Sequence, residues 1–235
     1  MPFRTGVLAA AALLWAAGNG AAIARAPLEI EQLEPEKGTL QAEYQGVYGH
    51  EAGHALQLSY GVTDHLVLGA EAEGVSGDGP LRFDQAGVLA LYRFSDPDDG
   101  GWAFGIEGQV DVSAASGFSG GALRGLVEHR APLWWVQGNL LASREHDDAG
   151  WGNSLSYSGS VSRRAGGLWI GVEASGDLAV PGGPDAERGG QYVGPSLILQ
   201  IDGHHRGLEL GTSLLARWHG EGPALVPHCF LQLSF

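Results

Sequence analysis

The feature that most constrains this chain is an alternation of apolar and polar side chains with a period of two, repeated in segments of about ten residues. Successive side chains of a β-strand point to opposite faces, so each segment predicts a strand with one apolar and one polar face. In the segment 102–113, the apolar face carries Trp102, Phe104, Ile106, Val110 and Val112. The polar face of the same segment carries Glu107, Gln109, Asp111 and Ser113.

The segment 151–163 indicates which kind of β protein this pattern fits, because serine occupies every second position from Ser154 to Ser162. Such a row would be unfavourable in a sandwich core, where each buried hydroxyl needs a hydrogen-bond partner. A watery barrel lumen tolerates it, and apolar outer faces with few charges suit lipid. We therefore predict an all-β fold, a single antiparallel transmembrane β-barrel, rather than a secreted β-sandwich or jelly roll.

The alternation gives twelve candidate strands, although roughly 10 to 14 strands fit the pattern. The predicted strands are residues 39–48, 53–61, 65–74, 81–94, 101–113, 120–130, 132–143, 151–163, 167–178, 190–202, 206–218 and 225–235. Short connections such as 62–64 alternate with longer, glycine-rich ones such as 179–189. Bacterial outer-membrane barrels have short periplasmic turns and longer extracellular loops, and an even count places both ends in the periplasm.

The N-terminus has the features of a secretory signal peptide. Arg4 precedes an apolar run over residues 6–17, and small residues lead to a predicted cleavage after Ala24. The run is too short to cross about 30 Å of hydrocarbon. The predicted organisation is therefore a cleaved signal peptide at 1–24, a short periplasmic N-terminal segment at 25–38, and an outer-membrane β-barrel at 39–235 in a Gram-negative bacterium.

The last predicted strand ends on an aromatic residue, with Leu231, Leu233 and Phe235 at alternating positions. This pattern resembles the C-terminal signal by which bacterial barrel proteins are handed to the barrel-assembly machinery. We therefore expect three partners: that machinery, outer-membrane lipid and lipopolysaccharide. Nucleic acid is excluded, because phosphate binding needs Lys and Arg, whereas this chain has a net charge of −14.

The polar faces predict which residues point into the lumen. The lumen-facing candidates are Glu43, Glu71, Glu73, Arg93, Glu107, Asp111, Arg124, Glu128, Glu173, Asp177, Glu209 and Arg217. These charges can pair across a small barrel and occlude it, or line a narrow pore that prefers cations. A slip of one residue in a strand would move its whole set to the other face.

One motif invites an enzymatic interpretation. His50, Glu51 and His54 match the H-E-x-x-H pattern of zinc proteases, which needs a helix to place both histidines on one face. These residues lie at a predicted hairpin tip without helical periodicity, so we predict no metal site and no cofactor. Outer-membrane lipid hydrolases need a Ser–His pair with a third orienting group, and the spacing of residues suggests no such triad. We predict that the protein is not an enzyme.

The segment 58–71, LSYGVTDHLVLGAE, reads as a strand, a short turn and a second strand. It resembles a group of proteobacterial outer-membrane β-barrels that includes transporters and proteins of the phenol meta-degradation pathway. The segment 90–95, ALYRFS, is similar to the same group. The resemblance covers about the first half of the mature chain and the last strand. It implies a barrel associated with uptake of small compounds, and it carries no catalytic residue across.

Three functions follow from these observations. The leading one is a passive channel or transporter for small molecules or ions, which the polar inward faces favour. A densely paired lumen would instead favour a non-conducting structural or adhesion barrel. The third is a lipid-modifying enzyme of the outer membrane.

Overall fold

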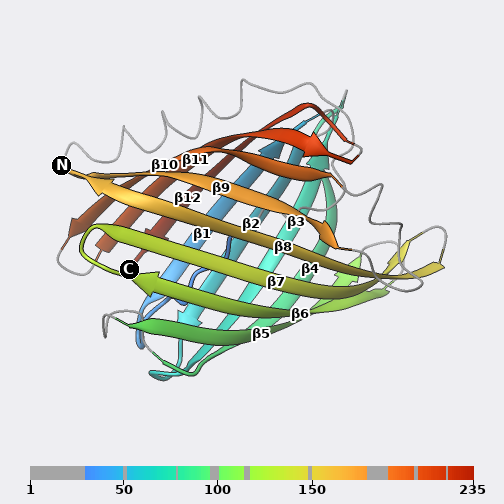
Figure 1. The fold of residues 1–235 in the computed structure, drawn as a ribbon. Helices are drawn as coiled ribbons and strands as arrows, with labels where there is room; N and C mark the ends of the chain where they lie inside the picture. Colours follow the sequence, from blue (N-terminus) through green and yellow to red (C-terminus); the bar gives the residue numbers. More distant parts are fainter. Residues whose placement is uncertain are drawn as a thin grey trace.

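The computed structural model describes residues 30–49, 52–77, 79–95, 101–113, 117–147, 150–178, 190–203, 206–220 and 222–235. The predicted signal peptide lies outside these residues. The described chain forms a closed antiparallel barrel (Figure 1). No described residue belongs to a helix long and apolar enough to cross a membrane.

The predicted count of twelve strands is confirmed, and each strand overlaps its predicted range. The strands are β1 (Leu40–Tyr48), β2 (Ala52–Gly61), β3 (Leu66–Ser76), β4 (Arg82–Arg93), β5 (Trp102–Ser113), β6 (Gly117–Arg130), β7 (Trp134–Asp147), β8 (Gly150–Ala165), β9 (Leu168–Leu178), β10 (Gln191–Gly203), β11 (Arg206–His219) and β12 (Leu225–Ser234). Each pairs with its neighbours in chain order, so the barrel is a simple up-and-down meander.

The barrel closes where β1 pairs with β12 as well as with β2. At this seam, Leu40 and Phe235 exchange two backbone hydrogen bonds, with N···O distances of 3.2 and 2.9 Å. A closed sheet has no edge strand with unpaired N–H and C=O groups. That property is required of any sheet that lipid surrounds, because lipid offers no hydrogen bonds.

The two ends of the barrel differ. The turn end carries the start of β1, the end of β12 and the connections 62–65, 94–101, 131–133, 166–167 and 204–205. The loop end carries the other connections, of which only 179–190 is as long as the sequence predicts. The connection 148–149 is shorter than the sequence predicts because β7 and β8 remain paired as far as Asp147 and Gly150, beyond the predicted strand ends at 143 and 151. The hairpin that they form extends beyond its neighbours (Figure 1).

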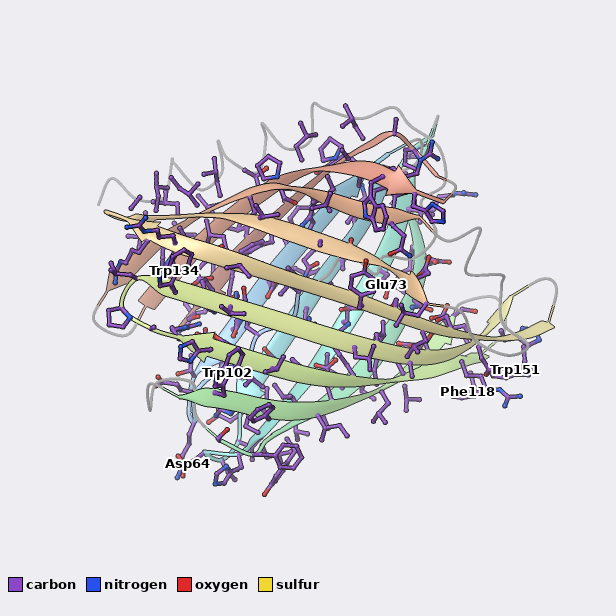
Figure 2. The ribbon with its side chains drawn as sticks, viewed as in Figure 1. Asp64, Glu73, Trp102, Phe118, Trp134 and Trp151 are labelled. Carbon is purple, nitrogen blue, oxygen red and sulfur yellow. The ribbon has the colours of Figure 1, made fainter. Side chains whose placement is uncertain are left out.

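The outer surface is a belt of exposed aliphatic side chains. It includes Leu56, Leu58, Leu68, Val88, Val110, Leu123, Leu140, Val161, Ile170, Val172, Leu197 and Leu214. Exposed aromatic residues border the belt, with Trp102 and Trp134 towards the turn end and Phe118 and Trp151 towards the loop end (Figure 2). An apolar band between two aromatic girdles is the outer surface of a transmembrane β-barrel.

The predicted assembly residues belong to this outer surface. Leu231, Leu233 and Phe235 alternate along β12 with the buried Gln232, which faces inwards, and the Phe235 side chain is 53% exposed. Their role in assembly remains a prediction.

Candidate functional site: the barrel lumen

The predicted lumen-facing residues lie on the inner face of the wall. Those buried inside the barrel are Glu43, Glu71, Arg93, Glu107, Asp111, Arg124, Glu128, Glu173 and Glu209. The remaining three, Glu73, Asp177 and Arg217, are partly exposed. They alternate along their strands with outward-facing residues, most of them apolar, which is why the period of two identifies their face. Their role as pore-lining residues remains a prediction.

Several of these side chains have polar partners in the wall. Glu73 accepts a hydrogen bond of 3.0 Å from Gln85 Nε2, and Asp111 accepts one of 2.8 Å from Gln109. The Arg217 guanidinium donates to the backbone oxygen of Gly222. Such pairs reduce the cost of holding charged groups on a narrow inner surface.

A short stretch of chain before β1 lies inside the barrel, and we call residues 30–35 the lumen segment. On one side it is bound to β4, β5 and β6. The Glu31 carboxylate lies 3.3 Å from the Arg124 guanidinium, which also lies 3.2 Å from Glu107. The backbone N–H of Leu33 donates to Glu128 (3.2 Å), and its carbonyl accepts from Arg93 (2.9 Å).

The lumen segment also reaches the opposite wall. Gln32 Nε2 donates to Glu209 on β11 (3.2 Å), and Gln232 Nε2 on β12 donates to Glu34 (3.2 Å). Strands β5 and β6 stand six positions from β11 and β12 in a ring of twelve, so they are on opposite sides. The lumen segment therefore crosses the lumen and ties two facing walls together.

Apolar packing holds the same segment. Leu33 is 1% exposed and packs against the inner wall in a cluster with Val67, Leu91, Ala103 and Leu126. Gly105 leaves space for it, because a Cβ there would lie 2.5 Å from the Leu33 side chain. The sequence predicts the segment 25–38 as periplasmic. Within it, residues 30–35 lie inside the turn end of the barrel, and residues 25–29 are outside the described residues.

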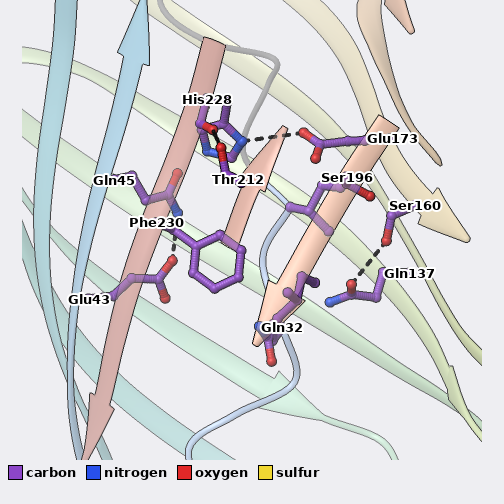
Figure 3. Close-up of a pocket in the computed structure, with 12 residues that line it drawn as sticks. Gln32, Glu43, Gln45, Gln137, Ser160, Glu173, Ser196, Thr212, His228 and Phe230 are labelled. Carbon is purple, nitrogen blue, oxygen red and sulfur yellow. Dashed lines mark hydrogen bonds and ion pairs between the residues drawn. The ribbon is translucent and has the colours of Figure 1, made fainter. Parts of the chain in front are cut away.

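Beside the lumen segment lies a small cavity with about 20 Å³ of space for water-sized molecules (Figure 3). Gln32 of the lumen segment lines it together with Glu43, Glu173, Ser196, His228 and Phe230 of the wall. Glu43 accepts a hydrogen bond from Gln45 (2.9 Å), and Glu173 lies 3.4 Å from His228 Nδ1. Two carboxylates, Glu43 and Glu173, and two rings, those of His228 and Phe230, thus line the cavity.

Comparisons with known proteins find similar folds among solved structures. No protein-family model matches the chain, and no curated sequence matches it. The solved structure of the NanC porin is similar over 83% of this chain and 98% of the porin, with a TM-score of 0.56 and 12% identity. The KdgM porin is similar over the same shares, with a TM-score of 0.54 and 9% identity. At these sequence identities, the similarity concerns the fold alone.

A structure of the KdgM porin in complex with disordered oligogalacturonate is also similar, with a TM-score of 0.50 and 8% identity over 84% of this chain and 98% of that one. These porins and the present chain therefore share the closed barrel that the alternating sequence predicts.

The sequence predicts that the H-E-x-x-H motif is not helical, and one of its two histidines lies among the described residues. His54 belongs to strand β2, while His50 and Glu51 lie outside the described residues. Within the described part of the chain, no group of three or more His, Cys, Asp or Glu side chains is placed to hold a metal ion.

His54 nevertheless belongs to a hydrogen-bonded chain that sequence reasoning missed. Its Nε2 lies 3.0 Å from Ser76 Oγ, and its Nδ1 lies 2.8 Å from the Tyr44 hydroxyl. All three occupy outward positions near the loop end of the first three strands. Only the pairing of β2 with β1 and β3 brings together side chains that are 10 and 22 residues apart.

Sequence reasoning also missed two inward aromatic residues. Trp135 and Trp169 are 1% and 4% exposed, and their rings meet edge to face at 5.7 Å inside the barrel. Trp135 donates to Glu128 (2.8 Å), and the Arg130 guanidinium lies 4.6 Å from the Trp135 ring centre. Their inward positions follow from the alternation of β7 and β9, which could have revealed them.

Proposed function

We propose that this protein is a passive outer-membrane channel for small polar solutes, with a preference for cations. The observation that carries the proposal is the charge of the inner wall. Nine of its predicted lumen-facing residues are carboxylates and three are arginines. Acidic side chains along a pore concentrate cations and repel anions, because fields are stronger where little water screens them.

The lumen segment determines how freely such a channel conducts. It crosses the turn end and is held there by ion pairs, hydrogen bonds and the buried Leu33. We expect the channel to conduct weakly while the segment is bound and strongly when it is released. A permanently bound segment would instead support the alternative function, a non-conducting structural or adhesion barrel.

The charge also bears on the class of solute. The KdgM porin has been solved in complex with disordered oligogalacturonate, which is a polyanion. An acidic lumen repels polyanions, so we expect this chain to admit cations and neutral solutes instead. Uptake of small compounds is also what the resemblance of segment 58–71 to barrels of the phenol meta-degradation pathway implies.

Planar bilayers test the proposal. We would measure single-channel currents of the purified barrel and of a variant lacking residues 30–35, under a salt gradient. The expected result is a cation-selective reversal potential in both proteins and a several-fold larger conductance in the deletion variant. A folded barrel that conducts in neither form would contradict the channel and support the non-conducting barrel.

One observation favours a second candidate function, a lipid-modifying enzyme. Ser76, His54 and Tyr44 form a chain of hydrogen bonds on the lipid-facing surface, in the order nucleophile, base and orienting group. A tyrosine oxygen is neutral, however, and stabilises a protonated histidine less than a carboxylate does. The channel therefore remains the main proposal.

Phospholipid hydrolysis in vesicles tests this second function. If the chain is an enzyme, Ser76→Ala and His54→Ala each abolish hydrolysis, while Ser143→Ala on the inner face leaves it unchanged. A wild-type protein that releases no fatty acid, or whose activity survives Ser76→Ala, removes the hypothesis.

A further inference from the structure

Two arginines of β6 are each shared between the lumen segment and the wall. In each case the guanidinium lies between 3.0 and 3.3 Å from two carboxylates, of which one belongs to the segment and one to the wall. We call these groups the shared-arginine sets. They are Glu31, Arg124 and Glu107, and Glu34, Arg130 and Glu128. Each set carries one negative charge in excess when all of its side chains are ionised.

The wall beside the segment is balanced in charge without it. Among the described residues, six charged wall side chains bind the segment or belong to the sets, three arginines and three carboxylates: Arg93, Arg124, Arg130, Glu107, Glu128 and Glu209. The segment therefore brings the excess charge, through Glu31 and Glu34. When the segment leaves, both shared arginines keep a carboxylate of the wall, so its release leaves neither of them as a buried, uncompensated charge.

The excess charge makes the bound segment sensitive to protons. Two carboxylates that share a site repel each other, and one of them holds a proton more tightly than a carboxylate in water does. With the segment bound, one proton in each set removes the excess and leaves each arginine one ionised partner. Once the segment is released, Glu31 and Glu34 lie in water and the excess no longer exists. The bound state therefore takes up about two more protons than the released state, one for each set.

We propose that acid closes this channel by holding the lumen segment inside the barrel, and that higher pH releases the segment. The direction follows from linkage, because the state that binds more protons is favoured as the pH falls. The proposal deepens the proposed channel function by naming its regulation, and it rests on that function only for the effect on current.

Other titratable groups near the segment act in the same direction. Glu43 and Glu173 line the cavity beside it and add further negative charge. His228 lies 3.4 Å from Glu173 and gains a positive charge in acid, which offsets that carboxylate. The next charged residues along the chain, Glu36 and Lys37, are exposed. A fall in pH thus reduces the negative charge around the segment as a whole.

Hydrogen exchange on the folded full-length barrel in detergent micelles tests the proposal without reference to current. The backbone N–H of Leu33 donates to Glu128 only while the segment is bound, so its protection against exchange measures the bound fraction. After correction for the intrinsic rate, the protection of residues 30–35 should be at least tenfold greater at about pH 5 than at about pH 8. Equal or weaker protection in acid would overturn the proposal.

Two variants locate the proton sites. Glu107→Gln removes the excess charge of the first set and keeps the ion pair between Arg124 and Glu31, so the logarithmic pH dependence of the protection should fall by roughly half. Glu34→Gln does the same for the second set by changing the segment, and it serves as the test if Glu107→Gln does not fold. Asp64→Asn, which neutralises an exposed carboxylate in the 62–65 turn, should keep the wild-type pH dependence. A folded Glu107→Gln or Glu34→Gln variant that also keeps it would overturn the assignment of the sets.

Planar bilayers separate this proposal from the channel itself. The wild-type conductance should fall several-fold between about pH 8 and about pH 5, and the variant lacking residues 30–35 should show a much smaller change. A barrel whose segment is better protected in acid but which never conducts would contradict the channel and leave the proton-dependent closure of the lumen standing. A barrel that conducts while its segment keeps the same protection at every pH would do the reverse.

Discussion

The guanidinium of Arg124 on the wall of β6 lies 3.3 Å from the carboxylate of Glu31 in the lumen segment. Both side chains are more than nine-tenths buried, and Arg124 shares its charge with Glu107 on the wall at 3.2 Å. Removing one partner of a buried ion pair is strongly destabilising, because the other charge remains without full compensation. Arg124 is therefore one of three arginines that link the lumen segment to the wall, with Arg93 on the Leu33 carbonyl (2.9 Å) and Arg130 on Glu34 (3.1 Å).

This link predicts which carboxylate controls the channel. The double variant Glu31→Gln, Leu33→Ala should loosen the lumen segment, because it loses an ion pair and about 2–5 kcal/mol of apolar packing and keeps only the contacts of Gln32, Glu34 and the backbone of residue 33 with the wall. Single-channel recordings should show a several-fold higher mean conductance than the wild type. Glu107→Gln serves as the control, since it removes the partner of Arg124 on the wall and leaves the ion pair between Arg124 and Glu31 in place. Unchanged conductance in the folded double variant would show that Glu31 and Leu33 do not control the channel.

Selectivity should follow the acidic residues of β3. Glu71 and Glu73 project from the same inner face, two residues apart, and Glu71 is 8% exposed. Neutralising both, as Glu71→Gln and Glu73→Gln, should move the reversal potential in a salt gradient towards zero, because the pore attracts fewer cations. Asp64→Asn, whose carboxylate is 74% exposed and pairs with Lys37, should not change it. If both proteins keep the wild-type reversal potential, these side chains do not set selectivity.

The sequence predicted the wall of the barrel better than its contents. The period of two is a local property, so it identified strands and their inward faces from neighbouring residues alone. The lumen segment depends instead on contacts between residues far apart, since Gln32 meets Glu209 across 177 positions and Glu34 meets Gln232 across 198. Which acid meets which arginine depends on the stagger of the closed barrel, which no single strand reveals. The hydrogen-bonded chain of Tyr44, His54 and Ser76 was missed for the same reason, because it depends on the pairing of three strands.

The apolar belt predicts a depth-dependent penalty for charge. Val88 lies near the middle of β4 and is 63% exposed. Val88→Arg should lower the free energy of unfolding in lipid vesicles by about 2–4 kcal/mol, the cost of arginine near the bilayer midplane. Leu168→Arg, at the turn-end start of β9, should cost only about 0–1 kcal/mol because the side chain reaches the interface. Denaturant titration measures both, and equal penalties would argue against a bilayer centred on this belt.

The seam predicts a distinct role for the last residue. Phe235 pairs its backbone with Leu40 and exposes its ring at the turn end. Deleting Phe235 removes two closing hydrogen bonds together with the terminal aromatic group, so we expect a several-fold loss of folded protein in the outer-membrane fraction. Phe235→Ala keeps the backbone pairing, and should show the same loss if the ring is the assembly signal. Phe94→Ala, which removes another exposed phenylalanine from the turn end, should assemble normally. If Phe235→Ala also assembles normally, the terminal residue acts through the seam rather than as a signal.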